Sequence, residues 1–344
     1  QAAIDHEVSL VVLAGDIFDG DWPDYGTGLF WNEQLNRLHG DGIPVVSVAG
    51  NHDAQSLISR NLPLPPNLTQ LSTSKPETVT FAELGIEVIG QGYATRDVSL
   101  DLTQAYPDGD PNLFTIGLLH TSLNGRPGHA SYAPSSVDAL RAKGYQYWAL
   151  GHVHAREIVH KDPWIVFPGN TQGRHAREVG SKGATLITVE DGAVSKVEHL
   201  ILDDVRWDLC TIDATGSTSV DDVRSAVEER LSAIASDAEG RLAAVRVEIT
   251  GSCAVHEDLW ADPHEFEAGI RSLANTGGRL WVEKVKVSTT RPVDLAAARE
   301  DDAVGALAQR IAELSDDPDA LVDYEDAFAG LTKKLSADVR TAEG

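Results

Sequence analysis

Four short apolar segments mark the first half of the chain, and each one ends in a polar residue. They run over residues 8–16 (VSLVVLAGD), 43–53 (IPVVSVAGNHD), 113–120 (LFTIGLLH) and 147–154 (YWALGHVH). Each segment is long enough for a strand and too short for a typical helix. Because their hydrophobicity is almost continuous, we expect strands that are covered on both faces.

The polar residues at these four ends should lie near one another. In sheets whose strands alternate with helices, ligands gather just beyond the carboxyl ends of the strands. We therefore expect one edge of the sheet to collect Asp16, Asn51, His52, His120, His152 and His154.

The intervening segments continue the alternation up to about residue 203. The pattern predicts helices over 28–38 and 135–143, the second capped by Ser135 or Ser136. Short apolar runs predict strands over 78–81, 86–89 and 164–167, and a hairpin of 184–190 with 193–201 around Asp191-Gly192.

The remainder of the chain is organised differently. Strands are expected over 206–214, 242–250 and 280–289, and helices over 220–235 and 263–274, which together make a β-α-β-α-β unit. From residue 291 the sequence is acidic with apolar residues at helical spacing. That tail either packs on its own protein or docks on a partner. We therefore predict three parts, 1–203, 204–290 and 291–344.

Composition limits the classes of function. The chain has 344 residues, 42% of them apolar, which is ample for a sizeable core. No apolar run approaches the length that crosses a bilayer, and no signal-peptide pattern opens the sequence. Two cysteines imply no disulfide framework and fit the cytoplasm. The net charge of −25 argues against a broad nucleic-acid surface of its own, because phosphate binding recruits Lys and Arg.

The residue types at the strand ends suit divalent metal ions. Asp16 can bridge two ions with its two oxygens, although a lone Asp is more simply a helix N-cap. Asn51 offers an amide oxygen, although GNHD is also typical of a turn. A lone His120 would be structural, but its place in the series favours a ligand. His152 and His154 would share one face of an extended segment.

The donor set indicates the kind of metal and the chemistry. No cysteine lies near these motifs, which argues against a structural zinc finger, and nitrogen with oxygen ligands favours manganese, iron or zinc. One bridging carboxylate with several histidines implies two ions about 3.5–4 Å apart, an arrangement that suits in-line displacement at phosphorus.

The ordered series GDIFD, GNHD, His120 and GHVH resembles the calcineurin-like metallophosphoesterase family over about residues 8–173. YWALGHVHAREIVH and DPWIVFPGNTQGRHARE are most similar to bacterial DNA-repair exonucleases of the SbcD and YhaO kind. The resemblance implies an α/β (α+β) chain: a two-sheet β sandwich flanked by helices, with a smaller β-α-β-α-β capping domain. It also implies two divalent ions at one sheet edge, manganese first, with iron or zinc as alternatives.

The resemblance further implies which residue holds which ion. Asp16 would bridge the two ions, and His154 would bind the second. The first ion would be completed by Asn51, His120 and His152. The family's opening D-x-H motif, which serves the second ion, has no match before Asp16. We therefore expect the chain to lack that first strand and to bind its second ion weakly.

Residues around the ions receive roles in the same way. His52 would act as the general acid that protonates the leaving oxygen, and Asp53 would hold His52 in place. Arg174 and His175 would approach a substrate phosphate, although a solvated surface loop explains them equally well. Weaker candidates of the same type are Arg126, His129 and Tyr132.

The expected function is a metal-dependent phosphodiesterase that acts on DNA, as an exonuclease or endonuclease subunit in DNA repair. Two metals would generate a hydroxide that attacks phosphorus. An SbcC-like ATPase subunit would bind the acidic tail, and a homodimer is expected by resemblance. The first alternative is a small-molecule or cyclic-nucleotide phosphodiesterase or phosphatase, which the negative charge favours. A catalytically silent scaffold is the second, supported by the missing D-x-H.

Overall fold

The structure is a computed structural model that describes residues 1–18, 25–55, 64–125, 132–275 and 278–292. The chain divides into two compact units. The first holds Gln1–Thr211, Ser225–Glu248 and Glu267–Lys286, and the second includes Ile212–Arg224 and Ile249–Phe266. The predicted acidic tail lies outside the described residues from residue 293 onward. Our boundaries near 203 and 290 stay predictions.

A six-stranded sheet carries two of the four apolar segments. Its strand order is β4-β5-β6-β7-β9-β8, with β5, β6, β7 and β9 parallel and the edge strands antiparallel to their neighbours. The strands are β4 (Glu77–Phe81), β5 (Ile86–Gln91), β6 (Phe114–His120), β7 (Tyr147–Gly151), β8 (Glu157–Lys161) and β9 (Trp164–Phe167). Every residue of β6 is buried, as its continuous hydrophobicity predicts.

The other two apolar segments belong to a separate sheet. The three parallel strands β1 (Val11–Leu13), β2 (Val45–Ser47) and β3 (Leu68–Gln70) pair in that order. The predicted hairpin is present as β10 (Gly183–Glu190) and β11 (Ala193–Ile201), with Asp191 and Gly192 at positive φ in its turn. The four strand ends therefore come from two sheets, where the pattern had suggested one edge of a single open sheet.

The six-stranded sheet packs against a separate hydrophobic core on each of its two faces. On one face, Leu118 and Ala149 join residues of β2 and of the hairpin, among them Val46 and Ile187. On the other face, Leu119, Trp148 and Leu150 pack with Leu140. This is a β sandwich with a second, helix-covered side, because successive residues of a strand point to opposite faces.

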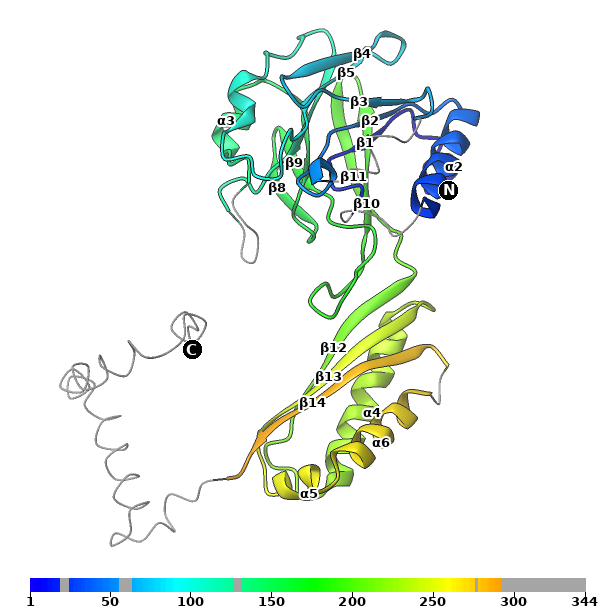
Figure 1. Cartoon of the computed structure of the whole chain (residues 1–344), viewed down its shortest axis with the longest axis vertical. Coiled ribbons are helices and arrows are strands. Elements are labelled where there is room, and N and C mark those ends of the chain that lie inside the picture. The colour runs from blue at the N-terminus through cyan, green and yellow to red at the C-terminus, as the bar shows by residue number, and fades with distance from the viewer. Residues whose placement is uncertain (19–24, 56–63, 126–131, 276–277, 293–344) are drawn as a thin grey trace, which may run out of the picture. The chain divides into compact units, whose positions relative to one another are not determined.

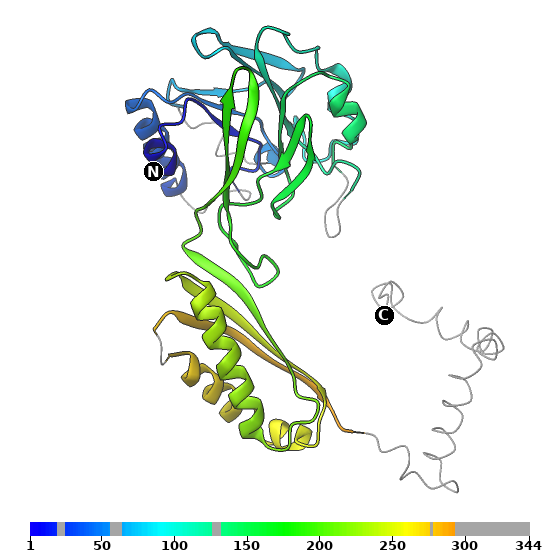
Figure 2. The ribbon, with the colours of Figure 1, turned by 180° about the vertical axis from the view of Figure 1, so that it is seen from behind.

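Helices flank the two sheets as expected. Helix α2 (Gly26–Gly40) lies beside β1–β3, and α3 (Val137–Arg141) lies beside the six-stranded sheet (Figures 1 and 2). The Oγ of Ser136 accepts a hydrogen bond from the backbone N–H of Ala139, so Ser136 is the N-cap of α3. The short α1 (Ala2–Asp5) precedes β1. The predicted fold class is confirmed.

The β-α-β-α-β pattern is also present. Strands β12 (Val205–Asp213), β13 (Leu242–Ser252) and β14 (Leu280–Thr290) pair in that order. The helices are α4 (Val220–Asp237), α5 (His256–Ala261), which the pattern did not predict, and α6 (Pro263–Asn275). Figure 2 shows α4 and α6 along one side of these strands. Val227, Val245 and Ile270 are fully buried between helix and sheet.

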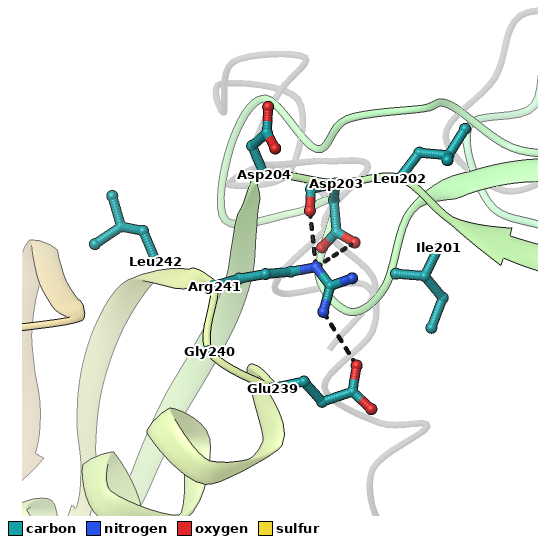
Figure 3. Close-up of a pocket in the computed structure, with 8 residues that line it drawn as sticks. All are labelled: Ile201, Leu202, Asp203, Asp204, Glu239, Gly240, Arg241 and Leu242. Carbon is teal, nitrogen blue, oxygen red and sulfur yellow. Dashed lines mark hydrogen bonds and ion pairs between the residues drawn. The ribbon is translucent and has the colours of Figure 1, made fainter. Parts of the chain in front are cut away.

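A buried ion-pair cluster fixes the start of β12. The carboxylate of Asp203, whose side chain is 0% exposed, accepts two hydrogen bonds from the guanidinium of Arg206, at 3.0 and 3.1 Å. Arg241 donates to the backbone oxygen of Asp203 at 2.8 Å and pairs with Glu239 (Figure 3). A surface pocket is lined by Asp203, Glu239 and Arg241 of this cluster, together with Ile201, Leu202, Asp204, Gly240 and Leu242. It contains none of the candidate metal ligands.

Candidate metal centre

The ends of three strands bring three predicted ligands into one group. Asp16 follows β1, His120 is the last residue of β6 and His152 follows β7. One ligand atom from each of these residues lies within 4.8 Å of the other two, and His120 is fully buried. The sequence spacing spans 136 residues between Asp16 and His152, so only the fold brings them together.

Glycines allow these segments to approach so closely. A Cβ on Gly15 would lie 2.7 Å from the Nδ1 of His120, and one on Gly50 would overlap the Oδ1 of Asp16. A Cβ on Gly151 would overlap the backbone oxygen of Ala14. Each motif therefore needs its glycine because of the space that the neighbouring motif occupies.

Two of the candidate ligands have backbone angles that residues other than glycine rarely adopt. Asp16 has φ of +53° and His152 has φ of +94°. Such strain persists only where the surroundings hold it, and it is concentrated at functional sites. Since β7 ends at Gly151, the prediction that His152 and His154 share one face of an extended strand is wrong.

Hydrogen bonding sets the orientation of His120. Its Nδ1 lies 2.8 Å from the backbone oxygen of Ala14, and because a carbonyl can only accept, Nδ1 carries the proton. In the neutral ring, Nε2 then carries the lone pair, and it lies 3.0 Å from the Oδ1 of Asn51 and 3.3 Å from the Oδ2 of Asp16. The second ring nitrogen of a metal-binding histidine is typically fixed in this way.

The converging atoms fit a divalent cation. The Oδ1 of Asn51 also lies 3.2 Å from the Nδ1 of His152. An amide oxygen, a carboxylate oxygen and two imidazoles thus face one another, and a neutral His120 offers this group a lone pair and no proton. A cation among them would satisfy these acceptors together, and such a mixed nitrogen and oxygen set suits manganese, iron or zinc.

Asp16 is held in its ionised form. Burial works against ionisation, but His120 in its protonated form and the backbone N–H of His52 together lower the pKa of Asp16, and a cation bound by a neutral His120 would supply the same positive charge. That N–H donates to Oδ1 at 2.9 Å. Oδ1 and Oδ2 therefore have different neighbours, His52 for Oδ1 and His120 for Oδ2.

The two residues predicted for catalysis follow Asn51 directly. His52 is half-buried, and Asp53 accepts backbone hydrogen bonds from Gly50 at 3.0 Å, Phe18 at 3.1 Å and Ile17 at 3.3 Å. Burial raises the pKa of Asp53. These bonds show that Asp53 joins the segment after β1 to the segment after β2. Its predicted role in orienting His52 stays a prediction.

His154 lies beside a residue that the sequence did not single out. Its Nδ1 is 2.6 Å from the Oε1 of Glu178, whose side chain is 7% exposed. Burial opposes ionisation of Glu178, but hydrogen bonds from His154 and from the backbone N–H of Arg174 lower its pKa to about 2. Glu178 closes the stretch PGNTQGRHARE, and its nearness to His154 depends on the fold rather than on spacing.

The candidate phosphate-binding residues flank the same carboxylate. The guanidinium of Arg174 lies 3.5 Å from Oε1 of Glu178, and the Nε2 of His175 lies 3.9 Å from it. Both side chains are about half exposed, so a substrate can reach them. Of the weaker candidates, Tyr132 packs edge-on against His152 at 5.4 Å between ring centres. The other two, Arg126 and His129, lie outside the described residues.

Comparison with known families explains this arrangement. The model of the calcineurin-like phosphoesterases matches residues 1–156, which contain Asp16, Asn51, His120, His152 and His154. The chain belongs to the calcineurin-like metallophosphoesterase family. The model of the middle domain of metallophosphoesterase YhaO matches residues 207–290, which contain the three-stranded sheet from Trp207 onward.

Relatives of this metallophosphoesterase chain include proteins named for DNA repair and for nuclease activity. The metallophosphoesterase YhaO of Bacillus subtilis is 34% identical over 67% of this chain and 57% of its own length. The DNA double-strand break repair protein Mre11 of Methanopyrus kandleri is 25% identical, over 64% and 53% respectively. One component of the nuclease SbcCD of Escherichia coli is also 25% identical, over 58% and 60%. The chain spans a little over half the length of these relatives.

Membership of the metallophosphoesterase family identifies the class of chemistry as hydrolysis of phosphate esters with divalent metal ions. It fixes neither the substrate nor the metal. Within the described residues, none of the helices combines the length and the apolar character that a bilayer crossing requires.

Proposed function

We propose that this chain is a metal-dependent phosphodiesterase that acts on DNA as an exonuclease or endonuclease subunit in repair. The observation that carries the proposal is the convergence of Asp16, Asn51, His120 and His152 on one point. Relatives named as a DNA double-strand break repair protein and a nuclease subunit support DNA as the substrate.

Each part of the centre has a proposed task. Asp16, Asn51, His120 and His152 would hold one divalent ion, and His154 with the second oxygen of Asp16 would hold another. When bound, such ions supply an activated water as nucleophile and neutralise negative charge that develops on the phosphoryl oxygens. Manganese is our first choice for both positions, with iron or zinc as alternatives.

The protein's own groups complete the reaction scheme. His52 would donate a proton to the leaving oxygen, and Asp53 would support it through the segment that both residues share. Arg174 and His175 would contact a phosphate of the substrate, since the planar fork of a guanidinium matches two phosphate oxygens.

A second candidate keeps the site and changes the substrate to a small phosphodiester or cyclic nucleotide. The net charge of −25 favours it, because a small ligand needs only the metals and one or two cationic side chains. If DNA is the substrate, a partner must supply most of the basic surface. We propose an ATPase subunit of the SbcC kind for that role, with a homodimer and a cytoplasmic location as further expectations.

One comparative assay separates these candidates. The chain is incubated with Mn²⁺ and duplex DNA with a free 3′ end, bis-p-nitrophenyl phosphate or cyclic nucleotides in parallel. We expect cleavage of DNA and of the model diester, and loss of both in excess chelator. Cleavage of the small diesters with intact DNA, also when an SbcC-like partner is added, would establish the second candidate instead.

A further inference from the structure

The contact between His154 and Glu178 differs from a typical surface ion pair. The side chain of Glu178 is almost fully buried, and its Oε1 approaches the Nδ1 of His154 to 2.6 Å. Glu178 lies 24 residues after His154, so a separate segment of chain delivers the carboxylate. Burying an ionised carboxylate is costly unless several hydrogen bonds compensate, so this placement needs a reason.

The carboxylate is fixed in orientation as well as in place. Its second oxygen, Oε2, accepts hydrogen bonds from the side-chain amide of Asn170 at 3.0 Å and from the backbone N–H of Arg174 at 2.8 Å. With Oε2 held by two donors, Oε1 is directed at His154. Rotation of the carboxylate would break all three contacts.

The segment that carries Glu178 is itself fastened to the residues around the start of β12. The side chain of Gln172 donates to the backbone oxygen of Val205 at 2.6 Å and accepts from its N–H at 3.2 Å. The indole N–H of Trp207 donates to the backbone oxygen of Gly173 at 3.0 Å. In return, the N–H of Gly180 donates to the oxygen of Trp207 at 2.9 Å.

We propose that Glu178 is a positioning residue that makes His154 an Nε2 ligand for a divalent cation. The ionised carboxylate can only accept, so it holds the proton on Nδ1 and places the lone pair on Nε2. Ala14 does the same for His120 through a backbone oxygen. Carboxylate, histidine and metal form a recurrent series in which the carboxylate fixes the ring and raises the basicity of the ligand. This inference rests on the proposed metal centre.

The tautomer of His154 in the metal-free wild-type chain provides the first test. Histidine labelled with ¹⁵N gives distinct signals for protonated and unprotonated ring nitrogens, and the His154→Gln spectrum assigns the resonance. At mildly alkaline pH we expect Nδ1 protonated and Nε2 unprotonated. The opposite tautomer would overturn the proposal.

Variants then connect the tautomer to metal affinity. In Glu178→Ala we expect the Nδ1–H signal of His154 to be lost. The dissociation constant of the weaker Mn²⁺ site, which His154 is proposed to serve, should rise about 10–100-fold. Glu198→Gln is the matched control, because that exposed glutamate forms a surface ion pair with Lys196 and is not part of the proposed metal centre. Unchanged signals and affinity in folded Glu178→Ala would refute the role of Glu178.

A milder change covers the case in which Glu178→Ala does not fold. Trp207→Phe keeps the ring and removes the N–H that binds Gly173, and we expect a smaller shift of the His154 signals in the same direction. If the His154 signals do not shift, the hydrogen bond between Trp207 and Gly173 does not hold Glu178 in place. If the wild type has the expected tautomer but binds no Mn²⁺, the proposed function fails and the positioning of His154 by Glu178 stands.

Discussion

His120, His152 and His154 are the same type of residue, yet their surroundings use different ring nitrogens. His120 directs Nε2 toward Asn51, whereas His152 directs Nδ1 toward the same oxygen, and His154 gives Nδ1 to Glu178. Each orientation follows from a hydrogen bond that a neighbouring segment supplies. A substitution beside the ligands should therefore affect metal binding as much as one in a ligand.

His52 provides the clearest test of catalysis at this scale. Because it is proposed to donate a proton and not to bind metal, His52→Ala should lower turnover about 10²–10⁴-fold while the Mn²⁺ affinity is retained. Turnover of bis-p-nitrophenyl phosphate and calorimetric Mn²⁺ titration measure the two quantities. The exposed His39→Ala serves as control. Loss of metal together with activity would assign His52 to the ligands.

Gly50 tests the close packing of the motifs. An alanine Cβ there would overlap the carboxylate of Asp16 and approach Cε1 of His120 to 2.7 Å. Because the site cannot widen without moving a ligand, Gly50→Ala should weaken Mn²⁺ binding about 10-fold or more. Gly40→Ala is the matched control, since a methyl group at that position would meet nothing within 4 Å. Equal affinities of the two variants would show that the motifs can separate without harm.

At the scale of elements, the sequence predicts strands and helices well where the signal is local. Residues 164–167 and 193–201 form β9 and β11 with the predicted bounds, because Gly, Pro and Asp-Gly turns delimit them. The strands β3 and β8 were not predicted. Leu68–Gln70 is only three residues long, and β8 is paired to β9 through a register shift that no local pattern encodes.

The candidate site also has features that the local sequence predicts and features that it does not. The strand-end positions of Asp16, Asn51 and His120 could be predicted, because apolar runs with polar ends are visible in the sequence. The partnership of His154 with Glu178 could not, because it depends on how a loop returns after β9. The division of the four apolar segments between two sheets was hidden for the same reason, since parallel pairing leaves no turn signal.

The Asp203 cluster makes a prediction about stability. Asp203→Ala would leave the buried guanidinium of Arg206 without its two-point partner, which should lower the free energy of unfolding by about 3 kcal/mol. Denaturant unfolding followed by circular dichroism measures the change. Lys196→Ala removes an exposed ion pair and should change stability by less than about 0.5 kcal/mol. Similar values for both variants would contradict the importance of burial.

At the scale of the whole molecule, the net charge and the candidate site favour different kinds of substrate. A net charge of −25 repels a polyanion, whereas the metal centre and the family place the chain among enzymes of phosphate esters. Locally bound cations can reverse the field at one point without changing it elsewhere. If DNA is the substrate, as proposed, its cleavage should therefore depend more steeply on a partner subunit and on salt concentration than cleavage of a small diester does.

Metal removal should also change the resistance of the fold to unfolding. A ligand that binds only the folded state stabilises it by about 2.7 kcal/mol at a hundredfold excess over its dissociation constant. We expect Mn²⁺ to raise the thermal midpoint of the chain and a chelator to reverse the shift. In His120→Ala the shift should be largely absent. An equal shift in that variant would place the stabilising ion elsewhere.

The proposed ligands come from strands of two different sheets. Asp16 and Asn51 follow β1 and β2, whereas His120 and His152 lie at the ends of β6 and β7. An ion coordinated by all four would be a cross-link between the two sheets of the sandwich. Amide protons of β1 and β2 should then exchange with solvent more slowly when the ion is bound, although neither strand touches it. The same metal–ligand bonds would then serve the reaction and hold the two sheets together.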